Sequence, residues 1–193
     1  EFSVEEFRAL ASHKKVVAIG ECGLDNFRPE NPEATRARQR EVFEQHVRLA
    51  VELNKPLMIH ARPTKGTQDA YQDLIEILTS YKKEHGERLL GDIHFFVGGV
   101  EEARALIDLD FTLSFTAVLT FTHDYDEVVQ FAPITHLLSE TDAPYVAPVS
   151  RRGQRNDPLS VRDVVAAMAA IRGEDEELVR ETVLSNARRL FAL

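Results

Sequence analysis

The sequence predicts an α/β fold, in which short buried strands alternate with amphipathic helices. Helical periodicity fills the intervals between short apolar runs, and strand followed by helix, repeated along the chain, is typical of this class. No low-complexity segment, internal repeat or Gly/Ser linker interrupts the pattern, so residues 1–193 are expected to form a single domain. The predicted strands are largely apolar, as strands buried on both faces of a parallel sheet are, and span residues 16–21, 57–60, 91–96, 111–115 and 137–140.

The predicted helices rest on apolar residues at helical spacing and on residues typical of helix ends. Ala70, Leu74, Ile77, Leu78 and Tyr81 share one face of a helix that Gly86 would end. Near the C-terminus, Ser160 with Asp163 three residues later resembles a capping box, and Gly173 would end the helix that follows it. The remaining helical patterns lie at residues 43–51, 100–109, 124–132 and 178–190.

The number of strands limits the possible architecture. A closed (β/α)8 barrel has eight strands and about 250 residues. Five strand–helix units in 193 residues therefore predict either an open sheet or a barrel that lacks its first units.

The composition excludes some classes of protein. The chain contains no apolar run near the roughly 18 residues of a membrane span, and its N-terminus does not resemble a secretory signal. A single cysteine, Cys22, rules out an intrachain disulfide, and together these features predict a cytoplasmic protein. A formal net charge of −9 argues against a general nucleic-acid coating protein, although bound divalent cations would reverse the field at an acidic site.

Polar residues follow four of the five predicted strands. Glu21, His60, His94 and Asp142 each lie at or near the end of an apolar run, so they would meet at the carboxyl edge of a parallel sheet. Two histidines and two carboxylates are suitable ligands for Zn, Mn or Mg. Each residue alone has an ordinary structural explanation, such as a hydrogen-bonded histidine or a rim ion pair. Their occurrence together favours a metal site.

Three segments resemble signature stretches of TatD-type deoxyribonucleases, a family of metal-dependent hydrolases with a TIM-barrel-like fold. The similarity continues to the C-terminus and covers essentially the whole chain. It implies a partial barrel with about five of eight strands, truncated at the N-terminus relative to the family. The three signature segments are residues 18–25 (AIGECGLD), 56–62 (PLMIHAR) and 139–145 (SETDAPY), and the similarity continues through residues 155–158 (RNDP) and 186–191 (NARRLF).

The resemblance implies roles for the four candidate ligands. Glu21 would bridge two metal ions, His60 and His94 would complete the ligands of one ion, and Asp142 would serve the other and orient or deprotonate a water molecule. Glu21 and Asp142 are thus the expected catalytic residues, and the expected reaction is hydrolysis of phosphodiester bonds, in the manner of a 3′–5′ exonuclease on DNA. The family's second ion also takes a His-x-His motif, which does not occur in this sequence, so one or two divalent ions are expected here.

Arginines near these residues are candidates for binding phosphate. Arg62, two residues after His60, could grip a phosphate with two parallel hydrogen bonds, and a rim ion pair explains it equally well. Lys65 and the cluster of Arg151, Arg152 and Arg155 could follow a nucleic-acid backbone or lie in a solvated loop. Cys22 is expected to be a buried filler rather than a nucleophile, because no histidine is placed to activate it.

Two other functions remain open at this point. The chain could be an inactive or weakened fragment that self-associates through exposed sheet edges. It could also be a metal hydrolase of another ester or amide, because this fold hosts many such reactions. Metal analysis and a nuclease assay distinguish these alternatives.

Overall fold

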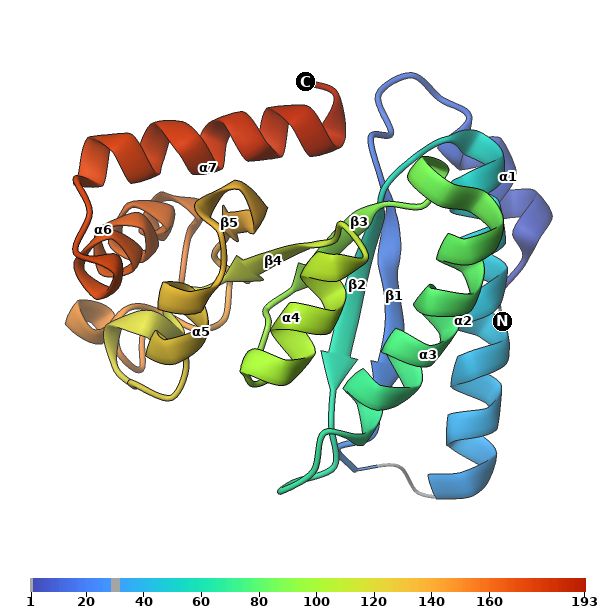
Figure 1. The fold of residues 1–193 in the computed structure, drawn as a ribbon, viewed down its shortest axis with the longest axis horizontal. Helices are drawn as coiled ribbons and strands as arrows, with labels where there is room; N and C mark the ends of the chain where they lie inside the picture. Colours follow the sequence, from blue (N-terminus) through green and yellow to red (C-terminus); the bar gives the residue numbers. More distant parts are fainter. Residues whose placement is uncertain (1, 29–31) are drawn as a thin grey trace.

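A parallel β-sheet forms the centre of the computed structural model, which describes residues 2–28 and 32–193 (Figure 1). Its strands lie side by side in the order in which they occur in the chain, and every pairing is parallel. The predicted α/β class is therefore confirmed. The strands are β1 (Ile19–Asp25), β2 (Leu57–Arg62), β3 (Gly91–His94), β4 (Thr112–Phe115) and β5 (Leu137–Ser139).

The helices cover the sheet in two groups (Figure 1). Helices α2, α3 and α4 pack against one face of β1, β2 and β3, whereas α5, α6 and α7 gather beside β4 and β5. Within the described residues, no helix is long and apolar enough to cross a membrane. The helices are α1 (Val4–Ala11), α2 (Pro32–Leu53), α3 (Asp69–His85), α4 (Val100–Asp108), α5 (Asp126–Phe131), α6 (Val161–Arg172) and α7 (Glu176–Phe191).

Several predicted boundaries were wrong, most clearly for β1. The apolar run at 16–18 precedes the strand, which continues past Glu21 to Asp25 because its last residues pair with β2. Only Cys22 and Leu24 of that second half are buried, so the segment does not look like a fully buried strand in the sequence. Helix α1 was not predicted, and α2 begins well before the predicted 43–51 face.

The end of α6 was predicted correctly, and its start was not. Gly173 adopts a left-handed conformation (φ 65°), and its N–H bonds the carbonyls of the last turn, as expected. The side chain of Ser160 does not cap the helix. Its hydroxyl instead bonds Asn156 Oδ1 at 2.5 Å and accepts a hydrogen bond from Arg151, so this serine holds the preceding loop together.

The two faces of the sheet differ in polarity, because side chains alternate along a strand. On β2, Leu57, Ile59 and Ala61 are buried in the hydrophobic core. His60 points to the opposite face, where its register partner on β3 is His94. The two predicted histidine ligands are therefore neighbours because of strand register.

A β-bulge brings Glu21 to the same face as His60. Ile19 pairs with Leu57, and Cys22 pairs with Ile59. Between these two pairs β1 therefore contains one residue more than β2. Without the extra residue, strict alternation would turn Glu21 toward the core side that holds Ile19. The bulge reverses this, as bulges beside functional sites commonly do.

Candidate active site

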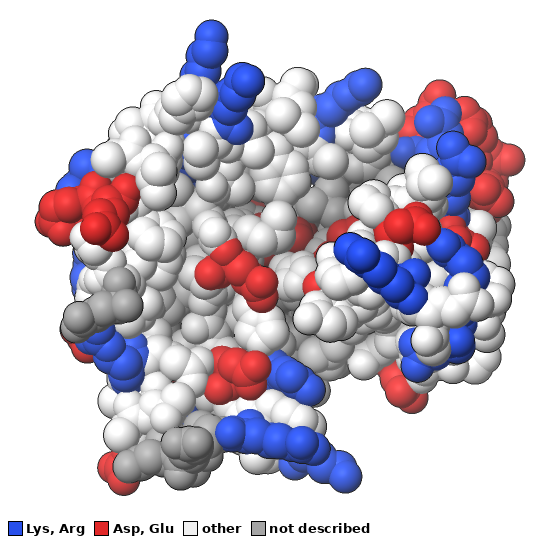
Figure 2. Space-filling model, turned by 180° about the vertical axis from the view of Figure 1, so that it is seen from behind, with Lys and Arg blue, Asp and Glu red and all other residues white. Residues whose placement is uncertain are grey.

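A cavity of about 420 Å³ lies beside Glu21 in β1, at the carboxyl ends of β2 and β3 and beside the loop that follows β5. Every residue predicted for the site lines it, and the lining residues that matter here are Glu21, His60, Arg62, His94 and Asp142. Seen from behind the sheet, acidic side chains gather in and beside a hollow near the middle of the molecule (Figure 2). The sites predicted from separate strands thus come together in one place.

His60 lies between two carboxylates. Its Nδ1 is 3.0 Å from Glu21 Oε1, and its Nε2 is 3.3 Å from Asp25 Oδ2. The sequence interpretation did not include Asp25 among the site residues, because it placed the end of the strand at Glu21. Asp25 is the true end of β1, and a strand that ends at an acidic residue is the signal that would have identified it.

His94 has an equivalent arrangement with a second pair of carboxylates. Its Nδ1 is 2.8 Å from Glu140 Oε1, and its Nε2 is 3.8 Å from Asp142 Oδ1. Glu140 also accepts hydrogen bonds from the Ser114 hydroxyl at 2.5 Å and the Phe95 amide at 2.7 Å. A carboxylate on one histidine nitrogen fixes the ring and directs the other nitrogen toward a metal position. Glu140 is therefore a candidate positioning residue, and sequence reasoning missed it.

The charges of these groups shift one another's pKa values. Burial lowers the pKa of His94, but the hydrogen bond and charge of Glu140, with further nearby carboxylates, raise it to about 9. Burial is the largest single influence and raises the pKa of Glu140, but the hydrogen bond and charge of His94, together with the hydrogen bonds from Ser114 and Phe95, bring that pKa below its ordinary value. The pKa of Asp142 is raised, first by burial and then by the charge of Glu140 against the opposing charge of His94. The charge states of His94, Glu140 and Asp142 in and beside the cavity therefore depend on one another.

The loop that carries Asp142 is held by a buried asparagine. Asn156 Nδ2 donates to the Thr141 carbonyl at 2.9 Å and to the Val146 carbonyl at 3.2 Å. Asp142 itself has a positive φ of 49°, which turns the chain sharply beside the cavity. Asn156 of the RNDP segment (residues 155–158) therefore holds the loop that carries Asp142 in place.

The donor set fits a divalent cation, although it is arranged in pairs. Two ligands bound at about 2.1 Å from one ion lie roughly 3 to 4 Å apart. The Glu21–His60 and His94–Asp142 separations of 3.0 and 3.8 Å fall in that range. Over residues 2–28 and 32–193, no three histidine, cysteine or carboxylate side chains converge on a single metal position. The nitrogen and oxygen donors suit Zn, Mn or Mg, and binding would require the two pairs to close on the ion.

Glu140→Gln tests the positioning role. The amide cannot hold the positive form of His94 and no longer fixes its ring as a carboxylate does, so we expect the affinity for Mn²⁺ to fall about 10- to 100-fold. Isothermal titration calorimetry measures the change. Glu127→Gln, on α5, is the control and should bind as the wild type does. Equal affinity in Glu140→Gln and the wild type would show that Glu140 has no part in the site.

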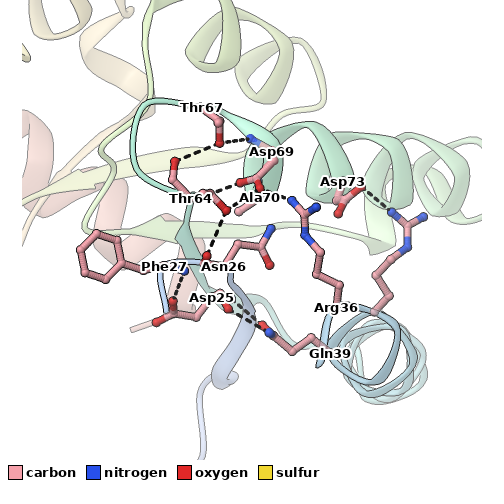
Figure 3. A network of polar contacts seen from close by, with 11 residues as sticks. Asp25, Asn26, Phe27, Arg36, Gln39, Thr64, Thr67, Asp69, Ala70 and Asp73 are labelled. Carbon is pink, nitrogen blue, oxygen red and sulfur yellow. Dashed lines mark hydrogen bonds and ion pairs between the residues drawn. The ribbon is translucent and has the colours of Figure 1, made fainter. Parts of the chain in front are cut away.

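A hydrogen-bond network fixes the loops after β1 and β2 (Figure 3). Asp69, at the start of α3, accepts hydrogen bonds from the Thr64 amide at 2.9 Å and hydroxyl at 2.8 Å and pairs with Arg36 of α2. The Thr64 hydroxyl also contacts the Asn26 carbonyl at 3.0 Å. On the other side, Gln39 donates from Nε2 to the Asp25 carbonyl at 2.9 Å. The network joins both loops to α2 and holds Asp25 beside His60.

Asp69→Asn should destabilise the protein in a pH-dependent way. Burial opposes ionisation of Asp69, but the hydrogen bonds from Thr64 and its neighbours lower its pKa from 3.8 to about 2. This stabilisation is complete above the unfolded pKa near 3.8 and is lost as pH falls toward 2. We expect Asp69→Asn to lower the free energy of unfolding by about 1 to 3 kcal/mol at neutral pH. Denaturant titrations should show that this difference shrinks below about pH 4, and a constant difference down to pH 2 would contradict the assignment.

Two other sequence expectations can be compared with the structure. Cys22 is buried and free, and burial raises the pKa of its thiol, as expected of a filler rather than a nucleophile. In the arginine cluster, Arg151 pairs with Asp157 at 2.8 Å, and Arg152 lies over the Phe121 ring at 3.9 Å. Arg151 therefore stabilises its own loop, and Arg152 joins that loop to the segment that contains Phe121.

A parallel sheet with histidines and carboxylates gathered at one cavity beside its strands is typical of α/β metal-dependent hydrolases. The comparisons with known proteins agree with this class. The family model described as TatD related DNase matches residues 1–192. The chain belongs to this family, as the sequence resemblance implied.

Relatives and solved structures give the same picture. The metal-dependent hydrolase YcfH of Escherichia coli K12 is 38% identical over 192 residues, which is 98% of this chain and 68% of the relative. The 3′-5′ ssDNA/RNA exonuclease TatD of Pantoea ananatis is 34% identical over 193 residues, covering 96% of this chain and 70% of that protein. The crystal structure of YjjV, a TatD homologue from E. coli K12, superposes with a TM-score of 0.86 at 26% identity, over 99% of this chain and 70% of that one. The chain is a metal-dependent hydrolase of this family, with a fold like that of its TIM-barrel-like members.

Proposed function

We propose that this protein hydrolyses phosphodiester bonds of nucleic acid by means of a bound divalent cation, removing nucleotides from the 3′ end of a strand. One observation carries the proposal: Glu21, His60, His94 and Asp142, from four separate segments, meet in one cavity together with Arg62. A relative at 34% identity is named as a 3′-5′ ssDNA/RNA exonuclease, which supports nucleic acid as the substrate class. We further propose that residues 1–193 act as a single hydrolase unit containing one or two ions of Mg, Mn or Zn.

The chain's own residues have distinct roles in this proposal. A divalent cation, when bound, supplies the electrostatic stabilisation of developing charge on the phosphate and lowers the pKa of water. Glu21, His60 and His94 would hold the ion, with Asp142 as a further ligand. Asp142 accepts the proton of the attacking water, because its carboxylate lies on the cavity with one oxygen 3.8 Å from His94 Nε2. Arg62 contacts a backbone phosphate of the substrate at the edge of the cavity.

The proposal is tested by metal content and by product pattern together. The purified chain is loaded with Mn²⁺, and the ion bound per chain is measured by mass spectrometry of the metal. A 5′-labelled single-stranded oligonucleotide should then be shortened stepwise from its 3′ end. Glu21→Ala should abolish both metal retention and shortening, whereas the exposed Glu181→Ala should affect neither.

The alternatives give different results in the same experiment. Much less than one ion per chain would overturn the hydrolase assignment for this chain and favour an inactive fragment. Metal binding with hydrolysis of simple esters, but with no shortening of the oligonucleotide, would indicate a different substrate. Residual nuclease activity that is equal in the wild type and in Glu21→Ala would indicate a contaminating enzyme.

A further inference from the structure

We propose that Phe27, Arg28 and Arg62 form a second phosphate subsite beside the catalytic cavity, which binds the phosphate next to the scissile one in a single nucleic-acid strand. The inference rests on the proposed function and extends it. It predicts that the protein recognises a chain of phosphodiesters rather than an isolated diester.

The subsite is a hollow of about 350 Å³ that adjoins the catalytic cavity. It is lined by Asp25, Phe27, Arg28, Thr35 and Arg62. Arg62 also lines the catalytic cavity, so the two hollows share one wall. A nucleic-acid strand whose scissile phosphate lies in the catalytic cavity would therefore continue past Arg62 into the second hollow.

The two arginines of the subsite rest on an aromatic ring and have no acidic partner among the residues that the structure describes. The guanidinium carbon of Arg62 is 4.0 Å from the centre of the Phe27 ring, and that of Arg28 is 4.8 Å from it. In the part of the chain that the structure describes, neither guanidinium has an ion pair. Stacking on a ring uses the face of a guanidinium and leaves its N–H edge available for phosphate oxygens.

Neighbouring arginines differ in this respect. Arg36 and Arg40, on the adjacent helix α2, pair with Asp69 and Asp73. Their charge is therefore used within the protein. Within the described residues, Arg28 and Arg62 thus differ from Arg36 and Arg40 in having no carboxylate partner, as a phosphate subsite requires.

The acidic residue in the hollow does not cancel this charge. Asp25 Oδ1 accepts the Phe27 amide at 2.9 Å, and Oδ2 faces His60 Nε2 at 3.3 Å. The carboxylate is thus directed at its own loop and at the catalytic cavity. Its hydrogen bond also fixes the backbone of Phe27.

Phe27 is held in place before any substrate binds. Asp25 is tied to Gln39 of α2 through both its N–H and its carbonyl, at 2.5 and 2.9 Å, and the Asn26 amide donates to the Arg62 carbonyl at 2.7 Å (Figure 3 shows this loop). A platform held in this way loses little conformational entropy on binding. The site is therefore preorganised for a strand that arrives from the catalytic cavity.

The subsite also offsets an electrostatic difficulty. The chain carries a formal net charge of −9, and the catalytic cavity is lined with carboxylates, both of which repel a polyanion. Two guanidinium groups next to that cavity provide local attraction along the path of the strand. Binding through them should therefore depend on salt.

The test measures binding separately from chemistry. A fluorescein-labelled single-stranded oligonucleotide is titrated with the wild type, Phe27→Ala, Arg28→Gln and Arg62→Gln in EDTA, with anisotropy as the readout, between about 50 and about 200 mM salt. Each arginine variant should weaken binding about fivefold to tenfold at the lower salt concentration and reduce the salt slope by about 0.7. Phe27→Ala should weaken binding too, because both guanidinium groups lose their platform.

Arg104→Gln is the matched control. Arg104 also lies over a phenylalanine ring, Phe131, at 4.4 Å, but it belongs to α4 and lines neither hollow. The Arg104→Gln substitution removes the same charge and should leave the affinity for the oligonucleotide unchanged. Inorganic phosphate at the same total phosphate concentration provides a second comparison and should displace the strand only weakly.

The outcomes separate the subsite from the proposed function. Equal affinity in the wild type, Arg28→Gln and Arg62→Gln, no binding by the wild type, or equal loss in Arg104→Gln would overturn the subsite. Displacement by inorganic phosphate as strong as by unlabelled strand would also overturn it, because it would show a simple anion site. If the strand binds as expected but is not cleaved with Mn²⁺ or Mg²⁺, the proposed function fails and the subsite does not.

Discussion

Asp142→Asn is expected to lower the rate of phosphodiester hydrolysis by about a thousandfold. The substitution replaces a carboxylate that lines the cavity with an amide of the same shape. The amide cannot accept the proton of an attacking water, and it is a weaker metal ligand. The Glu21–His60 pair stays intact, so the protein should still bind cations, with reduced affinity.

The assay is the initial rate of oligonucleotide cleavage with saturating Mn²⁺, measured beside circular dichroism to verify folding. Asp124→Asn, in an exposed loop before α5, is the matched control and should retain full activity. An Asp142→Asn rate within tenfold of the wild type would mean that another group accepts the proton.

Gly23→Ala is expected to destabilise the protein by about 4 kcal/mol or more. Gly23 pairs with His60 across β1 and β2, and a Cβ at this position would lie 1.9 Å from the His60 carbonyl oxygen. Its φ of 146° is also unfavourable for a residue with a side chain. Relief of the overlap would push β1 away from β2 and separate Glu21 from His60. We therefore expect both the free energy of unfolding and the affinity for Mn²⁺ to fall.

Gly153→Ala separates the overlap from the backbone effect. Gly153 also has a positive φ of 80°, but a Cβ there would meet no atom within 4 Å. Its substitution should cost only about 1 to 2 kcal/mol of backbone strain. Urea titrations of the three proteins measure the difference. Similar costs for both alanine variants would show that β1 and β2 can separate freely at Gly23.

The sequence predicted much of the fold because the helical and buried strands carry strong local patterns. The helices near 70–81 and 161–172 and strands β2 to β5 were found with small boundary errors. Strand β1 was misplaced, since its pairing and its bulge depend on β2 rather than on its own residues. Helix α1 was missed although Val4, Phe7, Leu10 and Ala11 repeat at helical spacing, so the sequence carried a short signal that the prediction did not use.

The candidate site was predicted through residue types and incompletely through geometry. Glu21, His60, His94, Asp142 and Arg62 were chosen from their places after strands, and all of them line one cavity. Their roles as metal ligands and in catalysis remain predictions. Asp25 and Glu140 were not among the chosen residues, since their importance lies in which histidine nitrogen each one faces.

The sequence by itself determined the α/β class, the family and the residue types available for catalysis, because these follow from local periodicity and from short motifs. The tertiary structure decided how those residues are grouped. Strand register placed His60 beside His94, and the bulge in β1 turned Glu21 toward them. The tertiary structure also placed Arg62 and Arg28 over Phe27, next to the cavity. Such relations join segments that are distant in the chain, so only the packing of strands and loops in three dimensions fixes them.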